Sequence, residues 1–463
     1  QTAPRMALSV RQAAKNKGKE MAAERRTQDW LAEPVQRIAQ DAKSPIYILA
    51  ATQTRLADVA TGEVVASPND IARLGFAIAA GVKGEAIVGL DDDAKAFAQT
   101  IADTLKAAKK PLVISGTSLQ DPAIMEAAAQ VAQNLGNAGL TLTVPEVNSM
   151  GLAILGGNSL EQAFAQDYDT VVIVENDLYR RLPAKQVDAA LAKAKNVIVL
   201  DHSETETVKK ANIVLSAASF AEGDGTVVSQ EGRAQRFYQV YDPSYYKPEL
   251  AIKESWRWLH AIETGVKGKA ISWTVLDDVI ESVAKNVPAL EAIQDVAPDA
   301  GFRVHGLKVA REPRRYSGRT AMRAPLSIHE PKQPTDQDSA LTFSMEGYVG
   351  NQTPSPLVPF AWSAGWNSPQ AWNKFQENVG GSLKGGDSGI RLFDRLAKRP
   401  ARTFVAPAPV LVNADSFRLV PMHHIFASGE FTVKTPAMES RIPEAMFAVG
   451  EQDAARLNVQ DGQ

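Results

Sequence analysis

The sequence has no cysteine among its 463 residues. This absence excludes disulfides, thiolate nucleophiles, zinc sites with cysteine ligands, and iron–sulfur clusters held by thiolates. No apolar run approaches the ~20 residues that a membrane-spanning helix needs. Neither sign of charge dominates, because 50 basic and 53 acidic residues leave a net charge of −3. The chain therefore has no general attraction to nucleic acid or anionic lipid, and its 44% hydrophobic residues suffice for a large core.

Sequence motifs for catalysis and for phosphate binding are missing as well. There is no G-x-S-x-G nucleophile elbow. The turns at 115–117 (Ser-Gly-Thr) and 156–159 (Gly-Gly-Asn-Ser) lack the G-x-G-x-x-G dinucleotide pattern and are typical of tight turns. The glycine-rich stretch 380–386 fails as a Walker A motif, because Gly386 and Asp387 stand where Lys and Ser or Thr are needed. We therefore predict no catalytic and no cofactor-binding residue.

The six histidines do not suggest a metal site. His423 and His424 are adjacent, so their side chains would point to opposite faces of a strand. The other four are not spaced like metal ligands; they are His202, His260, His305 and His329. We predict no metal ligand in this chain.

The two ends of the sequence suggest a piece of a longer polypeptide. The first residue is Gln1, with no Met and no signal-like apolar region. The last residues, 458–463, read as a turn that should lead into a strand.

The hydropathy pattern divides the chain into four parts. Residues 1–44 are charged, with helical spacing of apolar residues. Over 45–240, short apolar strands alternate with amphipathic helices, which predicts a Rossmann-like α/β domain with a doubly wound parallel sheet. The expected strands lie at 46–50, 112–114, 140–144, 171–174, 197–200 and 213–215, with helices expected near 68–82, 91–110 and 121–136, and from 159 and 183.

Residues 241–410 form a mixed segment rich in proline and glycine, with helices expected near 254–262 and 275–284. The stretch 310–359 reads as an irregular loop, which predicts a segment that wraps over neighbouring surfaces. Its arginines between Arg311 and Arg323 suit either a solvated loop or docking to an acidic neighbour. The tryptophans of this half suit either a core or an interface; they are Trp256, Trp258, Trp362, Trp366 and Trp372. A β-rich module is expected over 411–463.

Residues 211–235 resemble a signature of the molybdopterin oxidoreductase superfamily, in which "ADVVLP" leads into "E-x-x-G-T" and "N-x-E-G-R-x-Q". The chain departs from it at Asn212, Ser216 and Ser229, where Asp, Pro and Asn are usual, and these departures count against pterin binding. The matching residues are Glu222, Gly225, Thr226, Glu231, Gly232, Arg233 and Gln235.

Stretches 146–151, 254–260, 311–323 and 366–375 look like the G subunit, which is the large iron–sulfur subunit of bacterial NADH:quinone oxidoreductase (respiratory complex I). The resemblance covers nearly the whole chain and, without cysteine, only the C-terminal part of that subunit. Residues 448–459 look like the opening of the superfamily's final β-barrel domain. The implied fold is α/β of the molybdopterin oxidoreductase type, with an irregular wrapping segment and the start of that barrel.

The resemblance also implies a role. In that family, 2Fe-2S and 4Fe-4S clusters in the N-terminal part carry electrons from the flavin subunit toward quinone, while the C-terminal part keeps the molybdoenzyme fold without its cofactor. The expected role is a cofactor-free structural part of a component of this proton-translocating oxidoreductase. Expected partners are the flavin-bearing and iron–sulfur subunits, with no nucleic acid and no direct membrane span. The expected location is peripheral, on the cytoplasmic side of the bacterial inner membrane.

Two other roles remain open from the sequence. The first is a fragment of an active molybdopterin-dependent oxidoreductase similar to formate dehydrogenase, which would need a bis-pterin pocket and a metal ligand. The second is binding of a small molecule or metal ion in the crevice of the sheet. The apolar residues near Phe447 further predict an exposed surface that makes the chain prone to associate.

Overall fold

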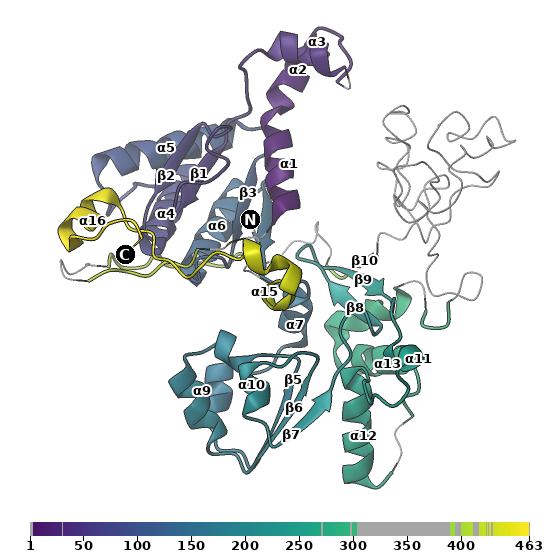
Figure 1. The fold of residues 1–463 in the computed structure, drawn as a ribbon. Helices are drawn as coiled ribbons and strands as arrows, with labels where there is room; N and C mark the ends of the chain where they lie inside the picture. Colours follow the sequence, from purple (N-terminus) through teal and green to yellow (C-terminus); the bar gives the residue numbers. More distant parts are fainter. Residues whose placement is uncertain are drawn as a thin grey trace, which may run out of the picture. The chain divides into compact units, whose positions relative to one another are not determined.

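The computed structural model describes residues 3–29, 31–269, 272–296, 299–302, 389–393, 400–410, 416–422, 424, 426 and 429–462. Residue contacts divide the chain into two compact units (Figure 1). Unit 1 comprises Gln1–Pro145 and Lys398–Gln463, and unit 2 comprises Glu146–Ala397. The sequence predicts domain boundaries near 45, 240 and 410, and these boundaries remain predictions.

Unit 1 begins with three helices, as the sequence predicts for residues 1–44. They are α1 (Pro4–Ala14), α2 (Asn16–Glu24) and α3 (Ala32–Ala39). Gly18 of α2 lies so close to α3 that an added Cβ would stand 2.6 Å from the Cβ of Ala39. The two helices therefore pack closely at this glycine.

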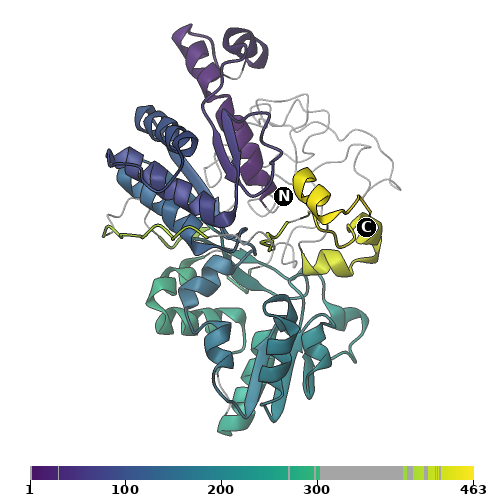
Figure 2. The ribbon, with the colours of Figure 1, turned by 90° about the vertical axis from the view of Figure 1, so that its left-hand side faces the viewer.

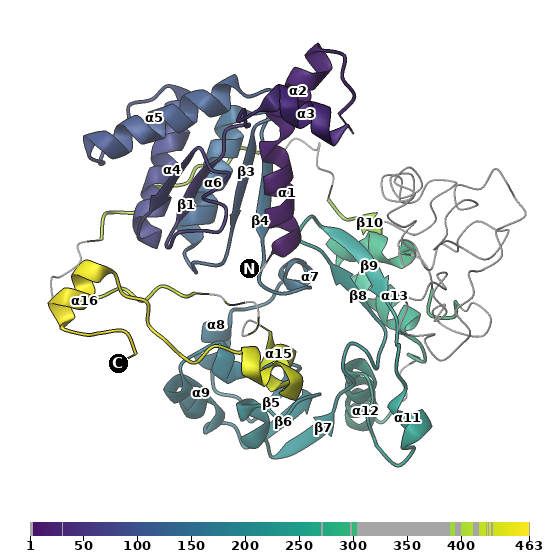
Figure 3. The same ribbon diagram turned by 45° about the horizontal axis from the view of Figure 1, so that its top comes forward.

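The α/β part of unit 1 contains two pairs of parallel strands. Strand β1 (Tyr47–Ala50) pairs with β2 (Gly62–Val65), and β3 (Leu112–Gly116) pairs with β4 (Gly139–Thr143). Three longer helices accompany them: α4 (Pro68–Lys83), α5 (Asp92–Ala107) and α6 (Pro122–Leu135). Figure 3 shows α4 beside α5 and α6. The core of this part is apolar and includes Leu74, Ile78, Ala98, Ile101 and Val131.

These three helices begin and end where the sequence signals indicate. The side chains of Ser67, Asp91 and Asp121 each accept a backbone N–H at the helix start, which replaces a missing intrahelical partner. Gly84 and Gly136 end α4 and α6 with positive φ angles of 81° and 74°.

Unit 2 contains a three-stranded parallel sheet in the order β5-β6-β7. Its strands are β5 (Thr170–Val174), β6 (Asn196–Asp201) and β7 (Ile213–Ser216). A core that includes Ile173, Val187, Leu191, Val197 and Val199 packs α9 against one face. The helices of this region are α7 (Ser149–Leu155), α8 (Leu160–Phe164), η1 (Leu178–Arg180), α9 (Ala184–Leu191) and α10 (Glu206–Lys209).

A second sheet of unit 2 is antiparallel, in the order β10-β9-β8. Strands β8 (Gly225–Val228) and β9 (Arg233–Phe237) form a hairpin, and β10 (Ile390–Arg391) joins β9. A core built on Val228, Ala234, Ile280 and Leu290 packs this sheet against helices. The helices after β9 are α11 (Pro243–Tyr246), α12 (Ser255–Lys267), α13 (Leu276–Asn286) and η2 (Pro288–Asp295).

The α/β class with parallel strands is confirmed. The parallel strands of the range 45–240 comprise β1 to β4 in unit 1 and β5 to β7 in unit 2. The hairpin at the end of that range is antiparallel, because Gly232 supplies the positive φ of 73° at its tight turn.

The described residues of 416–462 contain helices α15 (Glu430–Lys434), η4 (Pro436–Arg441) and α16 (Glu451–Leu457) and no strand. The β-rich module expected over 411–463 is thus not found in these residues. Local signals explain α16: acidic residues occupy its first turn, and Asn458 ends it with a φ of 54°. The start of a barrel stays a prediction.

Candidate functional site at the carboxyl edge and the signature segment

Ligands of open α/β sheets bind outside the carboxyl ends of the strands. In unit 2 this edge is formed by the residues that end or follow β5, β6 and β7, namely Glu175, Asp201 and Ala217. The hydrogen bonds of these residues decide what the edge can bind.

The buried polar groups at the ends of β5 and β6 bind the chain's own loops. Oδ1 of Asp201, a residue only 6% exposed, accepts from the backbone N–H of His202 at 2.7 Å and of Ser203 at 3.1 Å. The fully buried Thr207 accepts from the N–H of Leu178 and donates to Oδ1 of Asp177, both at 2.8 Å. These contacts organise the two loops that follow β5 and β6.

Helix α12 closes the remaining part of the edge. Glu175, with a positive φ of 48°, accepts a hydrogen bond from the Ser255 hydroxyl at the start of α12. The backbone of Lys253 continues the sheet, accepting from Ala218 N–H at 2.8 Å. The Trp258 indole donates to the Ser216 carbonyl at 2.8 Å. Residues 253–258 overlap a stretch that carries the complex I resemblance, and they cap this sheet.

Asn212, a departure from the superfamily signature, has a structural role. Its Oδ1 accepts from the N–H of Val197 at 2.7 Å, and its own N–H donates to the Val197 carbonyl at 2.8 Å. An amide oxygen thus performs the acceptor role open to an aspartate, without the charge. This substitution keeps β7 in register with β6.

The signature glycine Gly225 and the neighbouring Gly223 lie against side chains of this chain. A Cβ on Gly223 would stand 2.8 Å from Cγ of Glu254, and one on Gly225 would meet the ring of Phe237. Glu222, which precedes them, accepts from the N–H of Ser219 at 2.9 Å. Close packing inside unit 2 therefore accounts for these positions.

Two charged residues of the signature, Glu231 and Arg233, pair with each other. Glu231 accepts from Nε of Arg233 at 3.1 Å and from Nη2 of Arg391 at 2.7 Å. Arg233 also donates to the Gly389 carbonyl at 3.2 Å. Ser229, another departure, closes the hairpin turn by donating its N–H to the Arg233 carbonyl at 2.9 Å. The ionic cluster fastens β10 to β9.

A pterin cofactor, which the superfamily implies, does not fit around Arg233 and Gly225. Its phosphates would need a cation that is not already paired, and its ring would need room beside the glycine. Arg233 is engaged by Glu231, and the space beside Gly225 is filled by the ring of Phe237.

Two buried polar side chains of the hairpin keep unsatisfied atoms and face α13. The Arg236 side chain is 2% exposed and donates Nη1 to Asp277 of α13 at 2.9 Å. Its Nε and Nη2 have no hydrogen-bond partner. The hydroxyl of Thr226, the residue paired with Arg236 in the hairpin, has no partner either. Burial raises the pKa of nearby Tyr238 to about 12; Arg236 opposes that rise and surrounding aspartates add to it.

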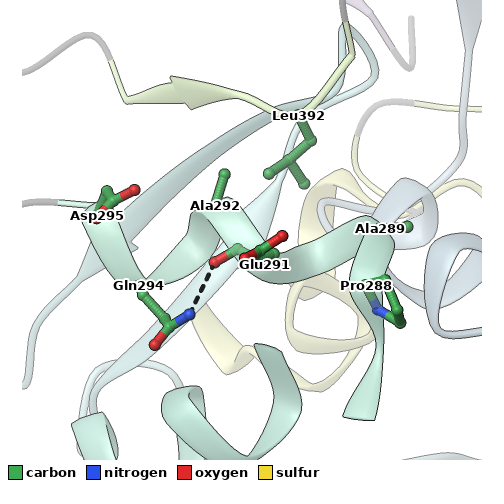
Figure 4. Close-up of a pocket in the computed structure, with 7 residues that line it drawn as sticks. All are labelled: Pro288, Ala289, Glu291, Ala292, Gln294, Asp295 and Leu392. Carbon is green, nitrogen blue, oxygen red and sulfur yellow. Dashed lines mark hydrogen bonds between the residues drawn. The ribbon is translucent and has the colours of Figure 1, made fainter. Parts of the chain in front are cut away.

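Two surface depressions occur in unit 2. One, about 530 Å³ in volume, lies on η2, where Gln294 donates to the Glu291 carbonyl at 3.2 Å and Leu392 borders the opening (Figure 4). The other, about 550 Å³, lies between the signature and α12, and residues of both signs line it, including Glu222 and Lys253.

The two turns considered as phosphate loops, at 115–117 and 156–159, are occupied by other groups of the same chain. A Cβ on Gly116 would collide with Thr143, and Asp121 already caps the helix that follows. Ser159 and Gln162 form the expected capping box of α8. The glycine-rich stretch 380–386, the arginines 311–323 and Trp362, Trp366 and Trp372 lie outside the described residues.

Among the histidines, His202, His260 and His424 are described, whereas His305, His329 and His423 are not. Within the described part of the chain, no group of three or more His, Asp or Glu residues could hold a metal ion. No helix in the described ranges combines the length and apolarity that a membrane crossing needs. The prediction that the chain has no catalytic, cofactor or metal residue stays a prediction.

Comparison with known proteins gives two findings. Residues 88–261 match the family model of molybdopterin oxidoreductase. The whole chain is 51% identical to the G subunit of NADH-quinone oxidoreductase from Pseudomonas putida and 46% identical to the G subunits from Escherichia coli K12 and Salmonella typhimurium. It covers 52% of each of these proteins, so the chain spans about half the length of the curated relatives it matches.

Proposed function

We propose, from the premise that this chain belongs to the family of NADH-quinone oxidoreductase G subunits, that it is a structural, cofactor-free part of such a subunit. In this role it supports the transfer of electrons from NADH to quinone, and the iron–sulfur clusters that carry these electrons lie in the half of the relatives' length that this chain does not span. The chain itself contributes no catalytic residue.

One observation carries the proposal: the carboxylates and the arginine of the superfamily signature bind other groups of the same chain. Glu231 engages Arg233 and Arg391, and Glu222 accepts from the N–H of Ser219. Outside the signature, the carboxylate of Asp201 organises its own loop. A signature used in this way stabilises a fold and leaves few groups for a cofactor. The absence of cysteine supports the same role, because thiolate-held clusters need cysteine.

We further infer that the fold is of the Rossmann-like, doubly wound molybdopterin oxidoreductase type, with domain boundaries near 44, 240 and 410 and the start of a β-barrel domain over 411–463. The parallel strands β1 to β7 and the family match over residues 88–261 support the fold type. We also propose that the flavin-bearing and iron–sulfur subunits are the partners, and that the protein is peripheral on the cytoplasmic side of the bacterial inner membrane.

The test is elemental analysis of the complete subunit, purified within its native complex, for iron, molybdenum and tungsten by mass spectrometry. The expected result is iron without stoichiometric molybdenum or tungsten. Either of those metals at one equivalent per subunit would overturn the proposal and favour a molybdopterin-dependent oxidoreductase. A complete subunit without iron would contradict the proposal that this chain is part of a protein that relays electrons.

A further inference from the structure

Residues 402–410, hereafter the strap, form an extended segment of unit 1 that runs along α4 and α6 (Figure 2). Its partners on these helices precede it in sequence by 269 to 341 residues. The strap belongs to the part of unit 1 that follows Lys398.

Three side-chain amides hold the strap, and each binds its backbone. Gln133 brackets one residue, donating Nε2 to the Arg402 carbonyl at 3.0 Å and accepting from the Arg402 N–H at 2.9 Å. Gln130 accepts from the N–H of Phe404 at 3.3 Å. Asn69 donates to one strap carbonyl at 3.1 Å and accepts from the N–H two residues later at 3.3 Å; these belong to Ala408 and Val410.

The amide of Gln130 is held in one orientation by contacts within α6 and α4. Its Nε2 donates to Oδ1 of Asn134 at 2.9 Å, and the Asn134 Nδ2 donates to the Ala79 carbonyl of α4 at 2.8 Å. This relay leaves the Gln130 oxygen as the acceptor for the strap. Turning either amide around would place two donors or two acceptors against each other. Asn69 is 6% exposed, so its amide is also confined. Together these four side chains form the amide surface.

The strap's own side chains contribute little to its attachment. Val405 and Val410 are 81% and 55% exposed, and only Phe404 and Pro407 are half-buried. Pro407 and Pro409 lack an N–H, but the donors that the amide surface uses belong to other residues. Prolines also favour the extended conformation and so reduce the entropy lost on binding. Recognition therefore depends mainly on the backbone, with Phe404 as the side chain whose replacement by a charge should loosen the strap.

We propose that the amide surface is a docking site for extended, proline-containing peptide segments read through their backbone, and that the strap is its releasable occupant. Neutral amides bracketing N–H and C=O groups imitate a neighbouring strand, which is the chemistry of strand addition. Because the strap buries few apolar atoms, its release is a local opening that does not require unit 1 to unfold. A peptide of the same class then competes for the surface.

Hydrogen–deuterium exchange on the full chain tests the attachment. Asn69→Asp keeps the acceptor for Val410 but replaces the donor to Ala408 with a carboxylate, and the first turn of α4 tolerates a negative charge. Gln133→Glu removes the donor to Arg402 in the same way. We expect exchange in the strap to become about 5-fold faster in either variant, because each loses one hydrogen bond.

The matched control is Gln99→Glu on α5, because the Gln99 amide binds only Asp103 of its own helix. It should leave strap exchange unchanged. The proposal is overturned if both amide variants keep the wild-type exchange rate over 402–410 while their circular dichroism shows an intact fold.

Binding in trans tests the class of occupant. The probe is a labelled, end-blocked peptide with the sequence of residues 401–410, added to a full chain that carries Phe404→Asp to loosen the strap. We expect saturable binding that weakens about 10-fold when Asn69→Asp and Gln133→Glu are added. A peptide with Thr at the positions of Val405 and Val410 should bind equally well, and N-methylation at the Arg402 and Val410 positions should abolish binding. Absence of saturable binding to the Phe404→Asp chain would reject the docking site.

Discussion

Two late segments of the chain return to earlier residues, and they are attached by opposite means. In unit 2, residues 389–393 add β10 to β9 and place Arg391 on Glu231. In unit 1, the strap lies on neutral amides of α4 and α6. The first attachment uses charge and close packing, whereas the second uses uncharged hydrogen bonds to the backbone.

The difference concerns which changes each attachment tolerates. Gly389 has a φ of 75°, and a Cβ there would collide with the Ala234 carbonyl. A Cβ on Gly232 would come equally close to the Phe393 ring. The attachment of β10 therefore depends on particular residues and on their charges, while the strap's attachment depends on its backbone and on three amides. Substitution, alkali and salt should separate the two.

The largest effect is expected from Gly232→Ala. The new Cβ would meet the Phe393 ring at a residue whose φ is 73°, which combines overpacking with backbone strain. We expect the free energy of unfolding to fall by about 2–4 kcal/mol, measured by urea denaturation. Gly268→Ala is the control, because that residue has a φ of 62° and no atom within 4 Å of its Cβ. It should cost only about 1 kcal/mol, and equal losses in both variants would contradict the packing argument.

Alkaline pH should weaken the hairpin region next. Burial raises the folded-state pKa of Tyr238 to about 12, above the ordinary value of 10.0. The stabilisation is therefore complete below pH 10 and is lost as the pH rises through about 12. Since solvent screens this partly buried phenol, we expect a loss on the order of 1–2 kcal/mol.

Urea denaturation from about pH 8 to about pH 11.5 measures that loss. Tyr238→Phe should flatten the pH dependence of the free energy of unfolding. Tyr179, whose pKa is also raised to about 12 by burial and by its hydrogen bond to Asp188, should still ionise late in this variant. An unchanged pH dependence in Tyr238→Phe would assign the effect to another group.

Glu231→Gln should have a smaller effect, because the Glu231 side chain is 50% exposed. The change removes the charge that pairs with Arg233 and Arg391. We expect a loss of about 0.5–1.5 kcal/mol and faster exchange over 389–393. Glu33→Gln, in an exposed pair with Arg37, is the matched control and should change stability by less than about 0.5 kcal/mol. Slow exchange over 389–393 in Glu231→Gln would show that strand pairing alone holds β10.

Salt should give the smallest and most selective effect. Raising sodium chloride from about 0.05 M to about 1 M screens exposed charges. We expect up to about 2-fold faster exchange over 389–393 and no acceleration in the strap. Acceleration of both segments would mean that the comparison between charged and neutral attachments does not hold.

Local sequence signals predicted most helices and all the parallel strands except β2. Asp121-Pro122 and Gly136 mark the two ends of α6, and Ser159 with Gln162 forms the capping box of α8. Each of these features depends on residues within a few positions of one another, so the sequence contains the complete signal.

Features that depend on distant residues were not predicted. The strap pairs Val410 with Asn69, and no periodicity relates residues so far apart. β10 and its ion pair to Glu231 likewise depend on contacts across 160 positions. Strand β2, over Gly62–Val65, was missed because it starts with glycine and glutamate and has only two apolar residues, whereas the equally short β1 and β7 contain longer apolar runs. At the signature, the sequence indicated the superfamily, but only the geometry revealed that Glu231 binds Arg233 and Arg391.

The relay from Gln130 through Asn134 to the Ala79 carbonyl has a consequence for how this chain and its relatives change over generations. A surface that binds backbone atoms places little selection on the exposed side chains of its occupant. Among relatives, mutations should accumulate freely at exposed strap positions such as Val405, while purifying selection keeps Asn69 and Gln133. The conserved part of this contact would then lie on the helices, and the strap could diverge without detaching.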